Sequence, residues 1–262
     1  SIGQWVWQNP TPTGESIYAI IFVDSQTGYA SGGAGHIIKT TNGGLSWYSI
    51  GSLGDDYIMS LSFLSEDSGF VFGNEGNLYY TDDGGNEWTI METGYEDENF
   101  TSGHFINSMV GLIACRNGKI LRTTDGGNSW SVAFSTMDKN IWAMQFVNEN
   151  TGYICCDGGY VYKTTNQGAN WTAKPTGSSE FLSSLFFTDE NTGYACGFLG
   201  TMIKTTDGGN NWITQTVGED INFTESYLTK CFFTDANHGW VGNDFGDIFI
   251  TIDGGTTWEL QA

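Results

Sequence analysis

The sequence is poor in basic residues. Its 262 residues include nine Lys and Arg against 30 Asp and Glu, which gives a formal net charge of −21. A surface of this kind repels phosphate backbones and anionic lipid headgroups. We therefore expect no nucleic acid partner and no membrane insertion, whereas cations and basic protein surfaces are favoured as partners.

Long apolar runs are also absent. The longest uninterrupted apolar stretch covers residues 17–23, and a membrane-spanning helix needs about 20 such residues. The chain shows no signal peptide pattern, and a mature secreted protein would lack one because it is removed after export.

Histidine and cysteine are few and scattered. The three histidines, His36, His104 and His238, lie far apart in the sequence, and nothing joins one of them to a nucleophile as a serine or cysteine hydrolase requires. The five cysteines form no CxxC pair and no Cys/His ligand spacing, so a zinc site is not expected. We expect most cysteines to be small buried hydrophobic residues.

What the chain does contain is a repeat. The segment Thr-Thr-Asn-Gly-Gly-Leu-Ser-Trp at 40–47 returns as Thr-Asp-Asp-Gly-Gly-Asn-Glu-Trp at 81–88, and four further copies follow. The copies end at tryptophans separated by 41, 42, 41, 41 and 46 residues. These are Trp47, Trp88, Trp130, Trp171, Trp212 and Trp258.

Each copy reads as four short strands. In the first copy the strands are expected at 17–23, 28–31, 36–40 and from Trp47 onward, where apolar, β-branched and aromatic residues alternate with turn residues. A four-stranded unit of about 40–45 residues, repeated four to eight times, is typical of a propeller. The sequence predicts an all-β fold, one β-propeller domain over 1–262 with six four-stranded blades. The repeats cover approximately 11–50, 51–91, 92–133, 134–174, 175–215 and 216–262.

The N-terminus carries an additional piece of the repeat. Trp5 lies 17 residues before Phe22, as Trp88 lies 17 residues before Phe105. Residues 5–10 therefore correspond to an outer strand without the other three. The hypothesis is that this strand pairs into the last blade and closes the propeller, and the alternative is a seven-bladed parent.

The pattern Thr-x-Asp/Asn-Gly-Gly-x-x-Trp resembles the Asp-box, or bacterial neuraminidase repeat. The whole unit, with Phe-Val-Asp at 22–24 and Gly-Tyr-Ala at 28–30, resembles propellers related to the photosystem II stability/assembly factor. Because such relatives are common in secreted and envelope proteins of bacteria, the resemblance implies a secreted, periplasmic or cell-surface protein. We expect it to be a monomer.

The Asp-box residues are predicted to be structural. A Thr hydroxyl and an Asp or Asn side chain can bond the backbone of their own turn, the glycines take positive φ, and the Trp packs beneath. Two copies carry Asn in place of Asp, which fits hydrogen bonding better than charge. The positions are Asn42, Asp83, Asp125, Asn166, Asp207 and Asp253, together with the six tryptophans above.

The resemblance to Asp-box proteins raises two enzyme classes. In sialidases it implies three arginines that grip a carboxylate, and this chain has only Arg116 and Arg122, so sialidase activity is disfavoured. Other Asp-box glycosidases use two carboxylates, which are too plentiful here to discriminate. We expect no catalytic residues, although the sequence leaves catalysis open.

One acidic position recurs in every copy, seven or eight residues before the last Phe of the first strand. In a four-stranded meander the connection into each blade and its second turn share one face, so these acids should form a ring around the mouth of the propeller. We call them the acidic ring: Glu15, Asp56, Glu98, Asp138, Glu180 and Glu225. Clustered carboxylates attract cations such as Ca²⁺ or a basic partner. The alternative is that all loops of this chain are acidic, because acids also occur on the opposite face.

The longest spacing contains an insertion. The surplus lies between Val217 and Tyr227 and includes Phe223 and Tyr227. Long loops on a rigid scaffold often carry function, so these aromatics are predicted to contact a partner, with a tolerated insertion as the alternative.

The sequence thus favours a non-enzymatic binding or scaffolding propeller that contacts a protein or glycan partner through its acidic face, and this face favours a basic partner. It should need no cofactor, although the acidic ring could hold Ca²⁺. The alternative is a carbohydrate-binding or carbohydrate-hydrolysing module that uses carboxylates on the same face.

Overall fold

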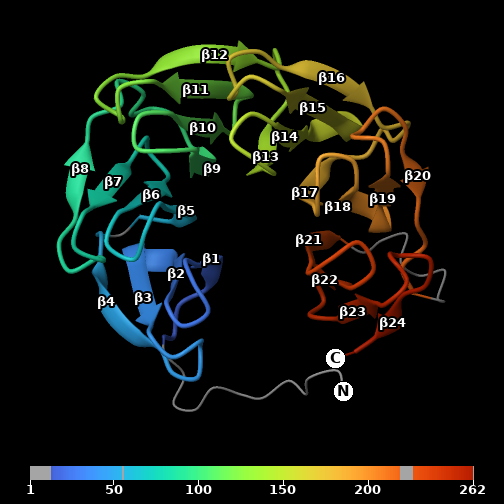
Figure 1. The fold of residues 1–262 in the computed structure, drawn as a ribbon, viewed down its shortest axis with the longest axis horizontal. Helices are drawn as coiled ribbons and strands as arrows, with labels where there is room; N and C mark the ends of the chain where they lie inside the picture. The colour runs from blue at the N-terminus through green and yellow to red at the C-terminus, as the bar shows by residue number, and fades with distance from the viewer. Residues whose placement is uncertain (1–12, 55, 219–226, 262) are drawn as a thin grey trace. The chain divides into compact units, whose positions relative to one another are not determined.

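The computed structural model describes residues 13–54, 56–218 and 227–261 (Figure 1). Within these ranges the chain forms 24 β-strands, and its helical segments are three short 3₁₀ turns. The strands lie in six four-stranded sheets, each with its strands in chain order. No helical segment in the described ranges is long and apolar enough to cross a membrane.

The chain divides into two compact units within its third sheet. Unit 1 comprises Ser1–Ile113 and Thr123–Trp130, and unit 2 comprises Ala114–Arg122 and Ser131–Ala262. The strands of the first three sheets are β1 (Ile17–Phe22), β2 (Gly28–Gly32), β3 (His36–Thr40), β4 (Tyr48–Ser52), β5 (Ile58–Phe63), β6 (Gly69–Gly73), β7 (Leu78–Thr81), β8 (Thr89–Met91), β9 (Phe100–Phe105), β10 (Gly111–Cys115), β11 (Lys119–Thr123) and β12 (Ser131–Ser135).

The last three sheets belong to unit 2, where short 3₁₀ turns follow two of the second strands. The elements are β13 (Ile141–Phe146), β14 (Gly152–Cys156), η2 (Asp157–Gly159), β15 (Tyr160–Thr164), β16 (Thr172–Pro175), β17 (Leu182–Phe187), β18 (Gly193–Gly197), η3 (Phe198–Gly200), β19 (Met202–Thr205), β20 (Ile213–Thr214), β21 (Leu228–Phe233), β22 (Gly239–Asn243), β23 (Ile248–Thr251) and β24 (Glu259–Leu260). The corresponding turn in unit 1 is η1 (Gly33–Gly35).

The second strand is fully buried in five of the six sheets, and β22 of the last sheet is partly buried. Every residue of β2, β6, β10, β14 and β18 is buried. Their sequences are short apolar runs without polar alternation, as expected for strands covered on both faces. The first strands also share a feature: β1, β5, β13, β17 and β21 each show a register shift near their start. A bulge there bends the strand as it enters its sheet.

The first and second sheets of unit 1 are joined by a tyrosine and a lysine. Tyr29 of β2 stacks on Phe63 of β5, with ring centroids 3.8 Å apart. Its hydroxyl donates to the carbonyl of Glu66 at 2.7 Å. Lys39 Nζ lies 4.9 Å from the centre of the Tyr29 ring and donates to the Gly84 carbonyl at 3.0 Å. The ring is therefore held between a phenyl face and an ammonium group.

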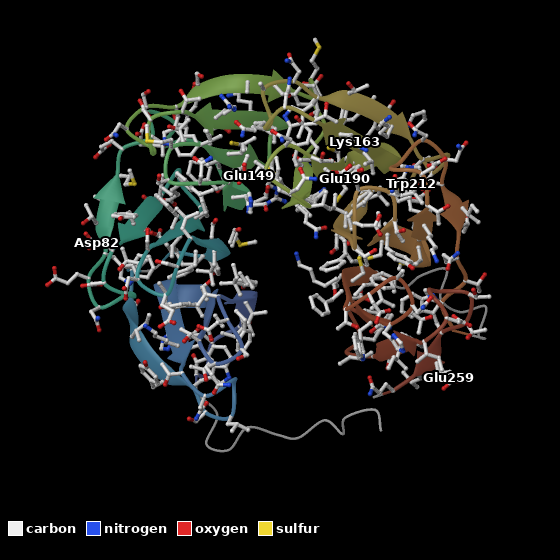
Figure 2. All side chains as sticks on the ribbon, in the orientation of Figure 1. Asp82, Glu149, Lys163, Glu190, Trp212 and Glu259 are labelled. Atoms are coloured by element: carbon white, nitrogen blue, oxygen red, sulfur yellow. The ribbon has the colours of Figure 1, made fainter. Side chains whose placement is uncertain are left out.

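Unit 2 repeats this Tyr–Lys contact twice. Tyr153 stacks on Phe187 at 3.5 Å and donates to the Glu190 carbonyl at 2.8 Å, and Lys163 Nζ reaches the Gly208 carbonyl at 3.5 Å. Figure 2 shows the Lys163 and Glu190 side chains in this region. The second copy uses Tyr194 on Phe233 at 3.6 Å, with Lys204 Nζ 2.7 Å from the Gly254 carbonyl.

The predicted fold is confirmed: the chain is all-β, with six blades of four antiparallel strands. The described residues form six blades, and they do not test the seven-bladed parent of the alternative. Strand bounds in the first copy agree within one residue, although the fourth strand starts at Tyr48 and not at Trp47. The same offset occurs in blade two, because Trp88 still belongs to the turn and donates from Nε1 to the Gly85 carbonyl at 3.1 Å. Residues 5–10, on which the closure hypothesis rests, lie outside the described residues.

Candidate functional site

The turn between the third and fourth strands has the same hydrogen-bonded core in every blade. We call these six segments the box hairpins; five read Thr-x-Asx-Gly-Gly-x-x-Trp, and the fourth carries Gln167, at a φ of +58°, in place of the first glycine. In blade two, Thr81 Oγ1 donates to Asp83 Oδ1 at 2.9 Å and accepts from the Gly85 N–H at 2.9 Å. Asp83 Oδ1 also accepts from the Glu87 N–H at 3.0 Å. The side chains thus satisfy the backbone of their own turn.

Asparagine makes the same bonds as aspartate. Asn42 Oδ1 accepts from Thr40 Oγ1 and from the Ser46 N–H, both at 2.9 Å. Asn166 Oδ1 accepts from the Asn170 N–H at 3.0 Å. Where the acid is present, these bonds stabilise its charged form: the Ser129 hydroxyl lowers the pKa of Asp125 to about 2, and the Thr257 N–H lowers the pKa of Asp253 to about 2. A carboxylate held in this way is a poor proton donor.

The opposite side of the blades carries the second turn of each sheet and the segment that leads into its first strand. We call this surface, within each unit, the connection face. In unit 1 its two parts are tied by the Gly33 N–H to the Ser16 carbonyl at 3.0 Å and by the Asn74 N–H to the Tyr57 carbonyl at 3.2 Å. In unit 2 the donors are Asp157, Phe198 and Asp244, and the acceptors are the carbonyls of Asn140, Phe181 and Tyr227 at 3.0–3.1 Å.

The acids of the predicted ring in unit 1 have three different environments. Glu15 is exposed. Asp56 Oδ2 accepts from Tyr79 Oη at 2.8 Å and from Asn77 Nδ2 at 2.9 Å. Glu98 is only 8% exposed. Asp56 and Glu98 are therefore engaged within the fold, and Glu15 is the member whose carboxylate faces solvent.

In unit 2, Asp138 is exposed in the segment before β13, with φ at +93°. Glu180 is half-buried and its Oε1 accepts from Ser179 Oγ at 3.1 Å. Glu225, the sixth member of the acidic ring, and Phe223 of the predicted loop contact lie outside the described residues. Among the residues that are described, no group of three or more His, Cys, Asp or Glu side chains is placed to hold a metal ion.

Tyr227, the second predicted contact, belongs to a group of aromatic side chains on the connection face of unit 2. We call Trp142, Phe181, Phe198 and Tyr227 the aromatic cluster. Ring centroids are 5.6 Å apart for Trp142–Phe181, 5.8 Å for Phe181–Phe198 and 4.8 Å for Phe181–Tyr227. Burial raises the pKa of Tyr227 to about 12, so its hydroxyl is neutral at neutral pH.

Two charged side chains contact Trp142 at the edge of the aromatic cluster. Trp142 Nε1 donates to Asp157 Oδ1 at 2.6 Å, and Asp157 Oδ2 accepts from the Asn140 N–H at 3.1 Å. The Arg116 guanidinium lies 5.3 Å from the Trp142 ring centre. Phe198 remains 39% exposed and Leu199, at the tip of the same turn, 43% exposed. The arrangement places partly exposed apolar surface beside ionic groups.

Except for Tyr227, the sequence prediction did not include these residues. A signal was available at the tips of the second turns, where aligned copies read Gly-Ala, Asn-Glu, Arg-Asn, Asp-Gly, Phe-Leu and Asp-Phe at 33, 74, 116, 157, 198 and 244. Phe198-Leu199 is the pair in this series with two large apolar side chains at an exposed turn tip.

The cysteines, His104, His238 and Arg122 lie in separate environments. All five cysteines are buried and form no disulfide, and burial raises the pKa of the Cys155 thiol. Burial also lowers the pKa of His104 to about 4. His238 Nδ1 lies 2.9 Å from Asp235 Oδ2 in an exposed turn. Arg122 Nε donates to the Gln167 carbonyl at 2.9 Å, so this arginine is used within the fold.

These features define an all-β, six-bladed propeller whose box hairpins are structural and whose connection face carries its unusual surface residues. The family described as photosynthesis system II assembly factor YCF48 matches residues 54–185, half of the sequence, and the chain belongs to that family. No curated protein sequence matches it.

Solved structures with the same fold include two proteins of that name. The structure "YCF48 bound to D1 peptide" has a TM-score of 0.80 at 19% identity, covering 98% of this chain and 83% of that one. YCF48 from Cyanidioschyzon merolae has a TM-score of 0.78 at 18% identity, with 97% and 87% covered. A GH74 xyloglucanase from Xanthomonas campestris gives 0.77 at 12% identity, covering 95% of this chain but 45% of the enzyme.

Proposed function

We propose that the chain is a non-enzymatic, protein-binding propeller that assists the assembly or retention of a partner protein outside the cytoplasm, as a secreted, periplasmic or cell-surface protein. Family membership supports this function, because a protein of the same family name has been solved with a D1 peptide bound. We assign the binding surface to the connection face of unit 2, because exposed apolar residues lie there beside charged groups.

The acidic character of the chain sets the expected partner. A net charge of −21 attracts basic surfaces and accelerates their association at low salt. Of the predicted ring, Glu15, Asp138 and Glu180 keep carboxylates that are exposed or half-buried on the connection face of their own unit. These three acids are the members proposed to contact a basic partner.

A pull-down from the envelope and medium of the source cell tests the proposal. The bait is the native chain beside a variant with Glu15→Gln, Asp138→Asn and Glu180→Gln. A matched control carries Asp82→Asn, Glu87→Gln and Glu149→Gln, three exposed acids at turns on the hairpin side; Figure 2 labels Asp82 and Glu149. A partner captured by the native chain and the control, but lost by the first variant, supports binding through the acidic connection face. If none of the three baits captures a specific protein, the proposed function is contradicted.

The second candidate is a carbohydrate-binding or carbohydrate-hydrolysing module, for which the half-exposed aromatics beside Asp157 are the favouring observation. The fold shared with a GH74 xyloglucanase is compatible with this candidate but specifies no substrate. Release of reducing sugar from xyloglucan, or binding of the oligosaccharide by calorimetry, would favour the carbohydrate function over the protein partner.

We also propose that the chain needs no cofactor to bind its partner and that it acts as a single copy. Calcium remains the ion best suited to carboxylate ligands. Sedimentation tests the single copy, and thermal unfolding with Ca²⁺ or with EDTA tests the cofactor. A monomer whose unfolding midpoint is the same in both buffers agrees with the proposal, and a Ca²⁺-dependent midpoint contradicts it.

A further inference from the structure

The aromatic cluster is not required by the repeat. The backbone bond from the Phe198 N–H to the Phe181 carbonyl is 3.0 Å long, and Gly33 and Ser16 make the same bond at 3.0 Å with no aromatic side chain. At the position of Phe198 the other copies carry Gly33, Asn74, Arg116, Asp157 and Asp244, and at the position of Phe181 they carry Ser16, Tyr57, Asn99, Asn140 and Tyr227. At the Phe198 position the other copies carry polar or small residues, whereas aromatics recur at the Phe181 position as Tyr57 and Tyr227, so Phe198 is the residue that needs another explanation.

Unit 1 offers a partial counterpart. Tyr18 and Tyr57 lie 6.1 Å apart on its connection face, but the turns beside them carry Gly33 and Asn74. In unit 2 the turn adds Phe198, whose ring packs on Phe181 at 5.8 Å and on Tyr227 at 5.8 Å. The exposed tip is extended by Leu199, which adopts a φ of +53°. A leucine at positive φ is strained relative to glycine, which occupies the tip in blade four as Gly158.

The charges around the aromatic cluster are predominantly acidic. Asp138 and Glu180 lie in the segments that lead into β13 and β17, and Asp157 and Asp244 begin the neighbouring turns. The bases of the same turns and segments are Arg116 and Lys139, and each lies over an aromatic ring, Trp142 at 5.3 Å and Tyr160 at 4.3 Å. Apolar surface bordered by acids is complementary to a segment that combines an apolar side chain with Lys or Arg.

The ring orientations favour a polypeptide over a sugar. Interplanar angles are 43° for Trp142–Phe181, 51° for Phe181–Tyr227 and 66° for Phe198–Tyr227, whereas Phe181–Phe198 is closer to parallel at 23°. A sugar ring stacks its C–H face on an open aromatic face, whereas rings that pack on one another, mostly at a tilt, present their edges to a partner side chain. Trp, Tyr and Arg are also the side chains most enriched at protein hot spots, and the aromatic cluster contains Trp142 and Tyr227 beside Arg116.

We infer that the aromatic cluster, with Leu199 and its acidic border, is the docking site for an extended basic segment of a partner protein, anchored by one apolar side chain next to Lys or Arg. This inference rests on the proposed protein-binding function and specifies its site and the chemistry of the partner.

A random peptide library displayed on phage, selected on the intact chain, provides the probe. Selected sequences should share an aromatic or branched aliphatic residue beside Lys or Arg. Synthetic copies should bind the Phe198→Ser, Leu199→Gly variant about tenfold more weakly, or worse, as for a hot-spot contact. They should also bind more weakly to the Asp138→Asn, Glu180→Gln variant and at raised salt.

The matched control is Leu45→Ser with Met109→Ser, which removes two exposed apolar side chains, 81% and 51% exposed, from turns on the hairpin side of unit 1. Its peptide affinity should equal that of the native chain. Selected peptides that are acidic or that lack an apolar residue overturn the site. Peptides that bind the Phe198→Ser, Leu199→Gly variant as well as they bind the control also overturn it.

The two proposals fail differently. If the pull-down captures a specific partner equally with the native chain and the Phe198→Ser, Leu199→Gly variant, the docking site is wrong and the protein-binding function stands. If no partner is captured and no peptide is enriched, both are wrong. Binding of oligosaccharides that is lost in the same variant, with no peptide enriched, also overturns the docking site and replaces it with a carbohydrate site.

Discussion

The two sides of the blades use the same repeat in different ways. On the hairpin side, the Thr hydroxyl bonds the Asx side chain in all six copies, at 2.6–3.0 Å. On the connection face the backbone bond recurs while the side chain changes from Gly33 to Phe198. The repeated side chains therefore maintain the fold, and the varied ones are free to be selected for binding.

The largest effect should come from the hairpin side, at Tyr194. Its fully buried ring stacks on Phe233, and its hydroxyl donates to the carbonyls of Ala236 at 3.0 Å and Gly254 at 3.1 Å. We expect Tyr194→Ala to lower the free energy of unfolding by about 3–5 kcal/mol, as large-to-small core changes do. Urea unfolding measures it, and Tyr194→Phe is the control that keeps the ring and should lose only about 1 kcal/mol. Equal losses in both variants would show that the stack contributes little.

A smaller loss is expected at Thr205, which is 1% exposed. Its hydroxyl donates to Asp207 Oδ1 and accepts from the Gly209 N–H, both at 2.9 Å. Thr205→Val keeps the shape but removes both bonds, so the free energy of unfolding should fall by about 2 kcal/mol. Thr256→Val, an exposed position of another box hairpin, is the control and should stay within about 0.5 kcal/mol. A neutral Thr205→Val would mean that water replaces the hydroxyl.

The hairpin side could be predicted from sequence because its bonds are local. Asp83 meets partners two and four residues away, so the motif contains its own geometry. The stack of Tyr29 on Phe63 joins residues of different blades, yet the fixed spacing of the repeat places them. By contrast, the repeat spacing predicted the position of Glu98 in its blade but not that its side chain is buried, because burial depends on the residues packed around it.

The aromatic cluster could not be derived in the same way. Its four members come from four separate segments, and the contact between Trp142 and Phe181 has its counterpart in unit 1 in Tyr18–Tyr57. Aligning the copies shows which residues depart from the pattern, but only the fold shows that the departures at Trp142, Phe181 and Phe198 meet.

Acid should weaken the box hairpins in a defined pH range. The pKa of Asp253 falls from its usual value of 3.8 to about 2, mainly because of the Thr257 N–H. A lowered folded-state pKa adds stability above the unfolded-state pKa, and this stability is lost as the pH falls through about 4 toward about 2. Asp253→Asn has no carboxylate to protonate, so its urea midpoint should fall less than that of the native chain between pH of about 5 and about 2.5. Identical pH dependence in the two proteins would contradict the assigned shift.

The smallest effect on stability is expected on the connection face, from the Phe198→Ser, Leu199→Gly variant. Serine removes a phenyl ring that is 39% exposed, which costs some packing against Phe181. Glycine relieves the positive φ of Leu199, and this gain offsets the greater freedom of glycine in the unfolded chain. The free energy of unfolding should stay within about 0.5–1 kcal/mol of the native value, measured by the same urea titration. A loss as large as that of Thr205→Val would place Phe198 among the residues that maintain the fold and remove the contrast between the two sides.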